Sequence, residues 1–384
     1  MDNLPPAAWR QPPISVVVIP RVSRSSTTNL DVSIIIPARN EESNLGNCLK
    51  SLTSQTGAIF EIIVVDDNST DRTREVAQSY RGVRVISSEP LPACWTGKNN
   101  AVITGAKKAR APWLLFTDAD TVHLPGSLAR ALAEAKREKA DLLSYSPEQI
   151  VITFSERAVM PVILAELAAQ YPPQKVRDSN SGIIAANGQY ILVRRTAYDA
   201  VGGHTAVASE ILEDVALARL FRDAGQRVYF RYGGDAVRTR MYRNWSQLRE
   251  GWTKNLALLF PHPQRLALQN LFLWIVAWLA IYVAASAALS QHLIWILSAA
   301  LWLLVYRRIR TAHFATTNNL IAIACGLPMF AYLLLRSKKA HANGMVSWKG
   351  RIYGVDATKE NTPAGMQAAK PIPRIAQQKL RTGN

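Results

Sequence analysis

The chain has 384 residues, a hydrophobic fraction of 48% and a formal net charge of +17 at pH 7. This length allows one large domain or two of ordinary size. No motif of interleaved basic and aromatic residues accompanies the charge, so nucleic acid is not an expected partner and an anionic membrane surface is favoured. The three cysteines, Cys48, Cys94 and Cys325, are far apart, and they offer neither a disulfide framework nor a zinc-binding spacing, which is typical of a reducing compartment.

The first two segments of the chain differ in pattern. Residues 1–31 are rich in Pro, Ser and Arg and are expected to form a flexible leader, since their apolar run Ile14–Ile19 is too short to span a bilayer. Residues 32–260 are expected to form a catalytic domain of α/β fold with a mostly parallel sheet, because strand-like and helix-like pieces alternate along most of the segment. The predicted strands are Val32–Ile36, Glu61–Val65, Val83–Ile86, Trp113–Phe116, Asp141–Tyr145 and Tyr190–Val193. The predicted helices are Asn44–Leu52, Asp71–Tyr80, Lys98–Lys108 and Ser127–Glu138, with Ser69-Thr70-Asp71 as an N-cap signal.

Residues 261–335 are predicted to form transmembrane or interfacial helices. Leu271–Leu289 has 19 residues without a charge, which is enough to cross a bilayer, whereas Leu293–Tyr306 and Leu320–Leu335 are shorter. The basic run Arg307-Arg308-Ile309-Arg310 between the last two would be cytoplasmic by the positive-inside rule. Buried core helices are the alternative, but a soluble domain would have to wrap such helices on every side.

Residues 336–384 are predicted to form a basic cytoplasmic tail. They hold ten Lys and Arg against two Asp and Glu, a net charge of +8. Three full crossings would separate this tail from a cytoplasmic catalytic domain. We therefore expect an even number of crossings, with Leu320–Leu335 re-entrant or interfacial because Gly326 and Pro328 interrupt it. The expected location is the cell inner membrane, multi-pass, with the catalytic domain in the cytoplasm.

The most informative motif is the run from Leu114 to Asp120. Four residues that suit a buried strand lead directly into Asp118 and Asp120. At the carboxyl end of a strand this spacing lets both carboxylates address one point, and open α/β sheets bind ligands at that edge. Two hard oxygen donors suit Mn²⁺ or Mg²⁺ carrying a diphosphate. Standing alone, the pair would more often be a solvated loop.

Three further polar clusters are expected at the same edge of the sheet. Arg39 and Asn40 follow the first predicted strand, and Asp66 and Asp67 follow the second, where a carboxylate can accept from a base or a ribose. Lys98 opens a predicted helix whose N–H groups could meet a phosphate. Each cluster alone would more often be an ordinary turn, but four on one edge indicate a nucleotide site.

Several of these motifs resemble those of the family 2 glycosyltransferases. The runs Val32–Glu42, Val64–Asp71 and Thr117–Asp120 occur in order and at suitable intervals. The resemblance covers roughly residues 32–260 and implies a nucleotide-sugar-binding fold of the GT-A type with an Asp-x-Asp metal motif. Ile211–Asp214 resembles the Glu-Asp motif whose Asp is the general base in inverting members.

Other motifs refine the resemblance. Gln247–Trp252 is similar to the Gln-x-x-Arg-Trp region of processive and ceramide-type members, but Glu-Gly-Trp stands where Arg-Trp is expected, which disfavours a polymer synthase. Trp95–Asn99, Arg157–Ala168 and Trp348–Tyr353 resemble membrane-bound enzymes grouped with hopene-associated and carotenoid glycosyltransferases. These relatives imply a lipid acceptor that is a hopanoid, a carotenoid or similar to a glycerolipid.

The resemblance implies a role for each candidate residue. Asp118 and Asp120 would hold Mn²⁺ or Mg²⁺, Asp214 would be the general base, and Glu213 would raise its pKa or orient the acceptor. The implied nucleotide-sugar-binding residues are Pro37, Arg39, Asn40, Glu41, Asp66, Asp67, Lys98, Asn99 and Asp118, and the implied acceptor residues are Gly188, Gln189 and Trp252. Two other interpretations stay open: Glu213 and Asp214 could be the exposed first turn of a helix, and Trp252 could be an anchor at the membrane interface.

The predicted reaction moves a hexose from a nucleotide diphosphate sugar, with UDP as the expected nucleotide, to the hydroxyl of a lipid acceptor. The lipid is expected to enter between the membrane helices and Arg157–Tyr171, which is either an amphipathic interfacial helix or a core helix. One alternative is a retaining polyisoprenyl-phosphate sugar synthase, or a nucleotidyltransferase, which would not need Asp214. The other is a non-catalytic membrane scaffold, which the intact set of acidic residues disfavours.

Overall fold

A computed structural model describes residues 30–288, 291–344, 346–348 and 351–353. The predicted leader lies outside the described residues apart from positions 30 and 31. The predicted basic tail lies outside them from residue 354 onward.

The central sheet has seven strands in the order β3-β2-β1-β4-β8-β6-β9. Neighbouring strands are parallel except at β8, which runs antiparallel to β4 and to β6. The strands are β1 (Val32–Ala38), β2 (Phe60–Asp66), β3 (Val83–Ser87), β4 (Trp113–Phe116), β6 (Leu142–Ser146), β8 (Ile191–Arg194) and β9 (Val228–Tyr232). The predicted mostly parallel α/β sheet is therefore confirmed, and β9 is a strand that the sequence did not predict.

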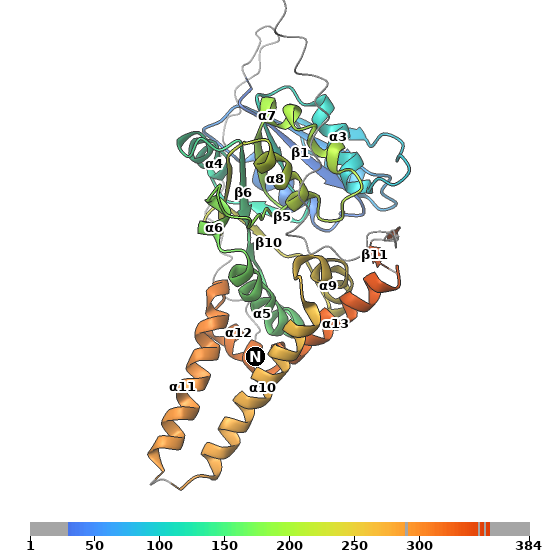
Figure 1. Ribbon diagram of the computed structural model, residues 1–384. Coiled ribbons are helices and arrows are strands. Elements are labelled where there is room, and N and C mark those ends of the chain that lie inside the picture. Colours follow the sequence, from blue (N-terminus) through green and yellow to red (C-terminus); the bar gives the residue numbers. More distant parts are fainter. Residues whose placement is uncertain (1–29, 289–290, 345, 349–350, 354–384) are drawn as a thin grey trace, which may run out of the picture.

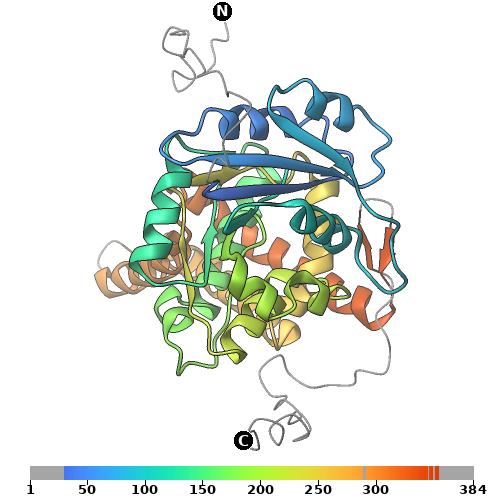
Figure 2. The ribbon, with the colours of Figure 1, turned by 90° about the horizontal axis from the view of Figure 1, so that it is seen from above.

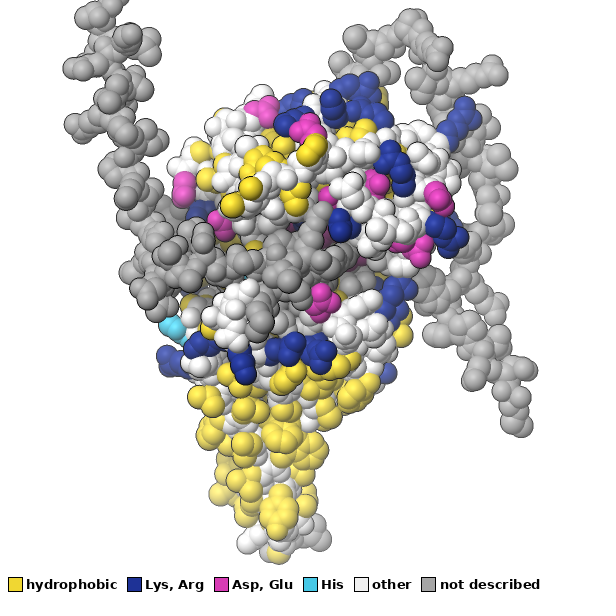
Figure 3. Space-filling model, turned by 90° about the vertical axis from the view of Figure 1, so that its right-hand side faces the viewer, with side chains coloured by type: hydrophobic (Ala, Val, Ile, Leu, Met, Phe, Trp, Pro, Cys, Tyr) yellow, Lys and Arg dark blue, Asp and Glu magenta, His cyan; other side chains and the backbone are white. Residues whose placement is uncertain are grey.

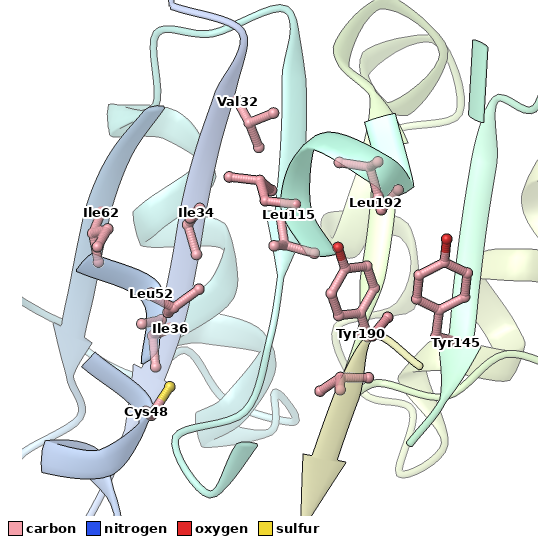
Figure 4. Close-up of a cluster of buried hydrophobic side chains, with 14 of the residues drawn as sticks. Val32, Ile34, Ile36, Cys48, Leu52, Ile62, Leu115, Tyr145, Tyr190 and Leu192 are labelled. Atoms are coloured by element: carbon pink, nitrogen blue, oxygen red, sulfur yellow. The ribbon is translucent and has the colours of Figure 1, made fainter. Parts of the chain in front are cut away.

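Helices cover both faces of this sheet (Figure 2). One face packs on α1 (Leu45–Thr53), α2 (Thr73–Gln78) and α4 (Ser127–Arg137), and the other on α3 (Gly97–Lys108), α7 (Arg195–Ala200), the 3₁₀ turn η2 (Gly203–Val207) and α8 (Glu213–Asp223). The side chains of β1 alternate between the two cores, because successive residues of a strand point to opposite faces. Ile34 and Ile36 lie with Leu52 of α1, as Figure 4 shows, whereas Ile35 joins the core on the α3 face. Helix α2 begins later than predicted, at Thr73, whose backbone N–H donates to Asp71 Oδ1 over 3.0 Å.

A small second sheet lies below the carboxyl ends of the parallel strands (Figure 1). It consists of β5 (Thr121–His123), β10 (Val237–Thr239) and β7 (Glu148–Gln149), with β10 antiparallel to β5 and parallel to β7. The sequence did not predict these short strands, of which β5 begins directly after Asp120.

Helix α5 (Phe154–Gln170) lies between the two sheets and the apolar helices below them (Figure 1). A capping box fixes its start, since Thr153 and Glu156 each bond the other's backbone N–H. Most of its residues from Glu156 to Glu166 are buried, Pro161 included. The expectation of an amphipathic interfacial helix over Arg157–Tyr171 is therefore wrong, and the alternative of a core helix holds.

Three helical stretches are long and apolar enough to cross a membrane: Pro263–Ser286, His292–Ala312 and Thr316–Ala342. The first two comprise α10 (Pro263–Ser286), α11 (His292–Ile309) and the short η3 (Arg310–Ala312), and they form a hairpin that projects from the molecule (Figure 1). Figure 3 shows this projection as an apolar surface below a row of Lys and Arg side chains. Only 17% of the most apolar part of α10 and 11% of that of α11 are buried within the protein, which leaves an apolar surface that a lipid bilayer could cover.

The third stretch differs from the hairpin. It contains α12 (Thr316–Ile321), the π-helical η4 (Ala322–Gly326) and α13 (Leu327–Ala342), and 50% of its most apolar part is buried. It packs against α5, α10 and α9 (Trp245–Leu259). Gly326 permits this packing, because a Cβ there would lie 2.0 Å from the carbonyl oxygen of Ala158. Pro328 sits in the first turn of α13 and does not interrupt the helical path.

The described chain continues after α13 into a two-stranded hairpin, β11 (Val346–Trp348) and β12 (Arg351–Tyr353). Strand β11 contacts α9, so this end of the described chain lies toward the part of the molecule that holds the two larger sheets (Figure 1). The short helix α6 (Pro173–Arg177) follows α5 and packs on β9.

Candidate active site

A cavity of about 590 Å³ opens where β1, β2, β4 and β6 end. Its walls come from the strand-end loops, from the segment before β8, from the start of α8, and from α5, α9 and the α11–α12 connection. The sequence-predicted residues that line it are Pro37, Arg39, Glu41, Asp67, Lys98, Asp118, Asp120, Gly188, Gln189, Glu213, Asp214 and Trp252. Gly188 and Gln189 reach the cavity because β8 is antiparallel, so its amino end lies at the edge where its neighbours have their carboxyl ends.

Three predicted nucleotide-binding residues are not in the cavity wall. Asn40 has a left-handed backbone (φ 53°) and its side chain accepts from the N–H of Thr70 over 2.9 Å. Asp66 is buried and pairs with Arg74 at 3.2 Å. Asn99 is fully buried, and its amide donates to the backbone carbonyls of Val207, Ala208 and Glu210. These side chains hold the loops around the cavity and do not face a ligand.

Asp118 and Asp120 stand on a loop braced from below by buried polar groups. Thr117 donates to the carbonyl of Gln189 over 2.8 Å, and Thr121 donates to the carbonyl of Asp118 over 2.7 Å. Burial lowers the pKa of His123, which lies beneath them, to about 3, so this imidazole is neutral at physiological pH. The hydrogen bonds of Thr117 and Thr121 therefore hold this loop in place, and the neutral His123 adds no charge next to the two carboxylates.

Lys98 occupies the centre of the cluster. Thr96 caps α3 by accepting from Asn99 N over 3.2 Å, which places Lys98 in the first turn. Its Nζ lies 2.9 Å from Asp118 Oδ1 and 2.9 Å from Glu213 Oε1. Burial alone would lower the pKa of Lys98, but the two carboxylates raise it well above its ordinary value.

Glu213 and Asp214 form the first turn of α8, as the alternative interpretation expected, but Glu213 is buried at 8% exposure and both line the cavity. Asp214 accepts from the N–H groups of Gly188 and Val215, each over 2.8 Å. Burial and the neighbouring Glu213 raise the pKa of Asp214 to about 6, although these two hydrogen bonds and Lys98 oppose the shift. Lys98 and Lys254 lower the pKa of Glu213 against the effect of its burial. The pair therefore holds an ionised carboxylate beside one that titrates near neutrality.

Helix α9 contributes residues that the sequence did not indicate: Tyr242 lies just before it, and Lys254 and Asn255 lie within it, all three in the cavity wall. Burial lowers the pKa of Lys254, although Glu213 opposes the shift. Asn255 Oδ1 is buried and has no hydrogen-bond partner within the described part of the chain. No motif marked these residues, because they sit among ordinary helix formers after the imperfect Gln247–Trp252 match.

Within that match, Gly251 and Trp252 line the cavity. Trp252 is 4% exposed, and its Nε1–H points at Met160 Sδ of α5 at 3.3 Å. Burial excludes the interpretation of Trp252 as a membrane-interface anchor. Gln247 is exposed and accepts from Arg243 N over 2.9 Å at the start of α9, outside the cavity.

The charge of the cavity wall bears on metal binding. The wall contains six carboxylates (Glu41, Asp67, Asp118, Asp120, Glu213, Asp214) against three cationic side chains (Arg39, Lys98, Lys254). An anionic diphosphate would be repelled here without a further cation. No group of three or more His, Cys, Asp or Glu in the described ranges could hold a metal by itself. Two carboxylates plus substrate phosphates and water are, however, a usual Mg²⁺ ligand set, so Asp118 and Asp120 fit a cation that arrives with its substrate.

The chain is similar to several known glycosyltransferases. The 4,4'-diaponeurosporenoate glycosyltransferase of Staphylococcus aureus is 29% identical over 336 residues, which cover 84% of this chain and 88% of that one. Among solved structures, a mannosyltransferase from Pyrobaculum calidifontis in complex with GDP-Man and Mn²⁺ matches with a TM-score of 0.44 at 16% identity, covering 82% of this chain and 87% of that one. Staphylococcus aureus TarS matches with a TM-score of 0.41 at 16% identity, covering 81% of this chain and 55% of that one. The family model for glycosyl transferase family 2 matches residues 33–202, the segment that carries the central sheet apart from β9 and also the Asp118/Asp120 loop. Over residues 33–202 the chain is therefore similar to glycosyl transferase family 2, and it is an enzyme with an α/β fold and apolar helices toward its carboxyl-terminal end.

Proposed function

We propose that this glycosyltransferase moves a hexose from a nucleotide diphosphate sugar, with UDP as the expected nucleotide, to the hydroxyl of a membrane lipid. The observation that carries the proposal is the continuity of one cavity. One end of the cavity holds the carboxylates that follow the strands of the central sheet. The other end is formed by α5, α9 and the connection between α11 and α12, next to the apolar helices. A polar donor and an apolar acceptor can therefore meet inside it.

The donor belongs at the strand ends. Pro37, Arg39 and Asp67 would line the nucleoside pocket, where Arg39 Nη1 already donates to the Asp67 carbonyl over 2.9 Å. Asp118 and Asp120 would hold Mn²⁺ or Mg²⁺ with the donor diphosphate. When bound, such a cation offsets the charge of the leaving nucleoside diphosphate.

Asp214 is the proposed base of an inverting reaction. Its carboxylate takes the proton of the acceptor hydroxyl while the oxygen attacks the anomeric carbon. The bond from that carbon to the diphosphate oxygen breaks, and the electron pair leaves with the nucleoside diphosphate. A pKa near 6 keeps Asp214 mostly ionised at pH 7 and still basic enough to accept the proton.

The acceptor belongs at the other end of the cavity. Leu164, Leu167 and Tyr171 of the α5 segment and Leu259 of α9 give this wall an apolar surface. His313, in the α11–α12 connection, stacks on Tyr232 with ring centroids 4.6 Å apart and completes the wall. The name of the Staphylococcus relative, which acts on a carotenoid-type lipid, supports a long apolar acceptor of the hopanoid, carotenoid or glycerolipid-like class.

The arrangement of the helices supports two membrane crossings, by α10 and α11, with the catalytic domain on the cytoplasmic face of the inner membrane. Thr316–Ala342 would lie at the interface between membrane and water. Half of its most apolar part is buried against the protein, and strand β11, which follows it, contacts α9. Exposed Arg336, Lys338 and Lys339 near its end suit anionic headgroups. A reporter fused at the C-terminus should report the cytoplasmic side, and a periplasmic readout would refute the two-crossing arrangement.

The deciding experiment for the activity is sugar transfer by the detergent-solubilised chain from a panel of nucleotide sugars into a membrane lipid extract. We expect a glycolipid product with Mn²⁺ or Mg²⁺ that disappears with EDTA and in Asp120→Ala, but persists in Glu89→Ala, which alters an exposed carboxylate paired with Lys107. A product made equally well by Asp120→Ala would contradict the metal assignment. Absence of both turnover and nucleotide binding would favour the scaffold alternative.

A further inference from the structure

The ammonium group of Lys98 contacts both the proposed donor side and the proposed acceptor side of the cavity. Lys98 Nζ lies 2.9 Å from Asp118 Oδ1, on the side assigned to the donor, and 2.9 Å from Glu213 Oε1, beside the assigned base. The Asp118 side chain is 27% exposed and that of Glu213 is 11% exposed, so these ion pairs are only partly open to solvent. The absence of a side chain at Gly188 leaves room for this meeting, since a Cβ there would lie 3.1 Å from Lys98 Nζ and 3.3 Å from Glu213 Oε1.

We propose that Lys98 is a positioning residue that occupies Asp118 in the donor-free enzyme and is displaced by the divalent cation onto Glu213. The inference rests on the proposed function, because it takes Asp118 as a metal ligand. It differs from the expected role of Lys98 as a phosphate-binding residue, because it assigns the lysine an effect on the metal before any nucleotide is present.

The physical argument is a competition for one carboxylate. Asp118 Oδ1 cannot accept the full interaction of an ammonium group 2.9 Å away and also coordinate a cation at about 2.1 Å, since the two positive charges would then lie close together and repel each other. Glu213 provides an alternative partner for the ammonium at no change of chain path, because Lys98 already contacts it. Lys98 therefore neutralises part of the acidic wall until the cation takes over that role.

The competition predicts that removing Lys98 tightens metal binding. The test is titration of Mn²⁺ alone, without nucleotide, into the full-length detergent-solubilised enzyme by calorimetry. Lys98→Met should bind Mn²⁺ at least about fivefold more tightly than the unchanged enzyme, the scale of a lost partly exposed ion pair. Lys98→Arg, which keeps the charge, should stay near the unchanged affinity. Lys107→Met on the same helix, whose partner Glu89 is exposed, is the matched control and should have no effect.

A second comparison keeps the inference testable if Lys98→Met folds poorly. Glu213→Gln removes one of the two carboxylates that Lys98 contacts, so Lys98 should pair more strongly with Asp118. This substitution should therefore weaken Mn²⁺ binding when it is made in the unchanged enzyme. It should weaken Mn²⁺ binding less when it is made in Lys98→Gln, which has no ammonium group to compete. If Lys98→Met and Lys98→Gln bind Mn²⁺ no more tightly than the unchanged enzyme and bind UDP less tightly, the inference is overturned in favour of a phosphate-binding lysine. The proposed function would then remain intact. Failure of the unchanged enzyme to bind Mn²⁺, with or without UDP, would overturn the metal assignment and the inference together.

Discussion

The backbone N–H of Gly188 donates to Oδ2 of Asp214 over 2.8 Å, and the same glycine leaves the space in which Lys98 and Glu213 meet. The segment before the antiparallel strand β8 thus supplies one backbone group that holds the proposed base in position.

Gly188→Ala should slow transfer. The new Cβ would lie 3.1 Å from Lys98 Nζ and 3.3 Å from Glu213 Oε1, so the cluster has to shift by a few tenths of an ångström. Misplacement of reacting groups makes a loss on the order of tenfold to hundredfold reasonable. The measurement is kcat with saturating donor. Gly182→Ala, where a Cβ would meet nothing within 4 Å, is the control, and equal rates for the two variants would contradict the positioning role.

Asp214→Asn should abolish the general base and keep the hydrogen bond from Gly188, because the amide oxygen can still accept it. We expect kcat to fall by roughly 10²–10⁴-fold. Binding of the nucleotide sugar, measured by calorimetry, should change little, since Asp214 lies on the acceptor side. Retained transfer would remove Asp214 from the mechanism and favour a retaining route.

The rate should rise with pH through the pKa of Asp214, about 6, because only the ionised carboxylate accepts a proton. For a single group of this pKa, the rate at pH 5 should be about one tenth of its plateau. Glu213→Gln removes a neighbouring negative charge that raises the pKa of Asp214, and the acid limb should therefore move to lower pH. A rate that is flat between pH 5 and 8 would be incompatible with Asp214 as the base.

Arg308→Ala should loosen the attachment of the membrane hairpin. Arg308 pairs with Glu166, whose side chain is 7% exposed on α5, while Arg308 itself is 43% exposed. Loss of the partner leaves a buried carboxylate, but solvent screening of Arg308 limits the cost to about 1 kcal/mol. The expected change is a drop in Tm of about 1–2 °C in detergent. The exposed neighbour Arg307→Ala is the control, and Glu166→Gln combined with Arg308→Ala should recover part of the loss.

The sequence predicted the sheet well where strands are buried on both faces. Val32–Ile36 and Trp113–Phe116 are apolar runs typical of a central strand, and both were found in place, the second with Asp118 and Asp120 after its end. It failed where strands are short or charged, as in β9 and β10, which carry Arg231 and Arg238. Their position is set by pairing with β6, β5 and β7, which a local pattern does not contain.

The site was predictable in its strand-end residues and not in its remaining walls. Asp118, Asp120 and Asp214 were marked by motif and spacing, and the structure brings them around one cavity. Lys254 and Asn255 reach that cavity only because α9 crosses beneath it, a tertiary relation with no local signal. Asn99 shows the converse case, since a motif residue next to Lys98 points into the protein and binds backbone carbonyls.

In the two-crossing arrangement, the return of α13 to the side of the catalytic domain determines where a product would be released. Only the α10–α11 hairpin then reaches the far half of the bilayer, and the cavity opens at the other end of that hairpin. A glycolipid leaving the cavity would enter the leaflet that supplied its lipid. Its sugar would appear on the opposite surface of the membrane only after a separate lipid-translocating protein had moved it there.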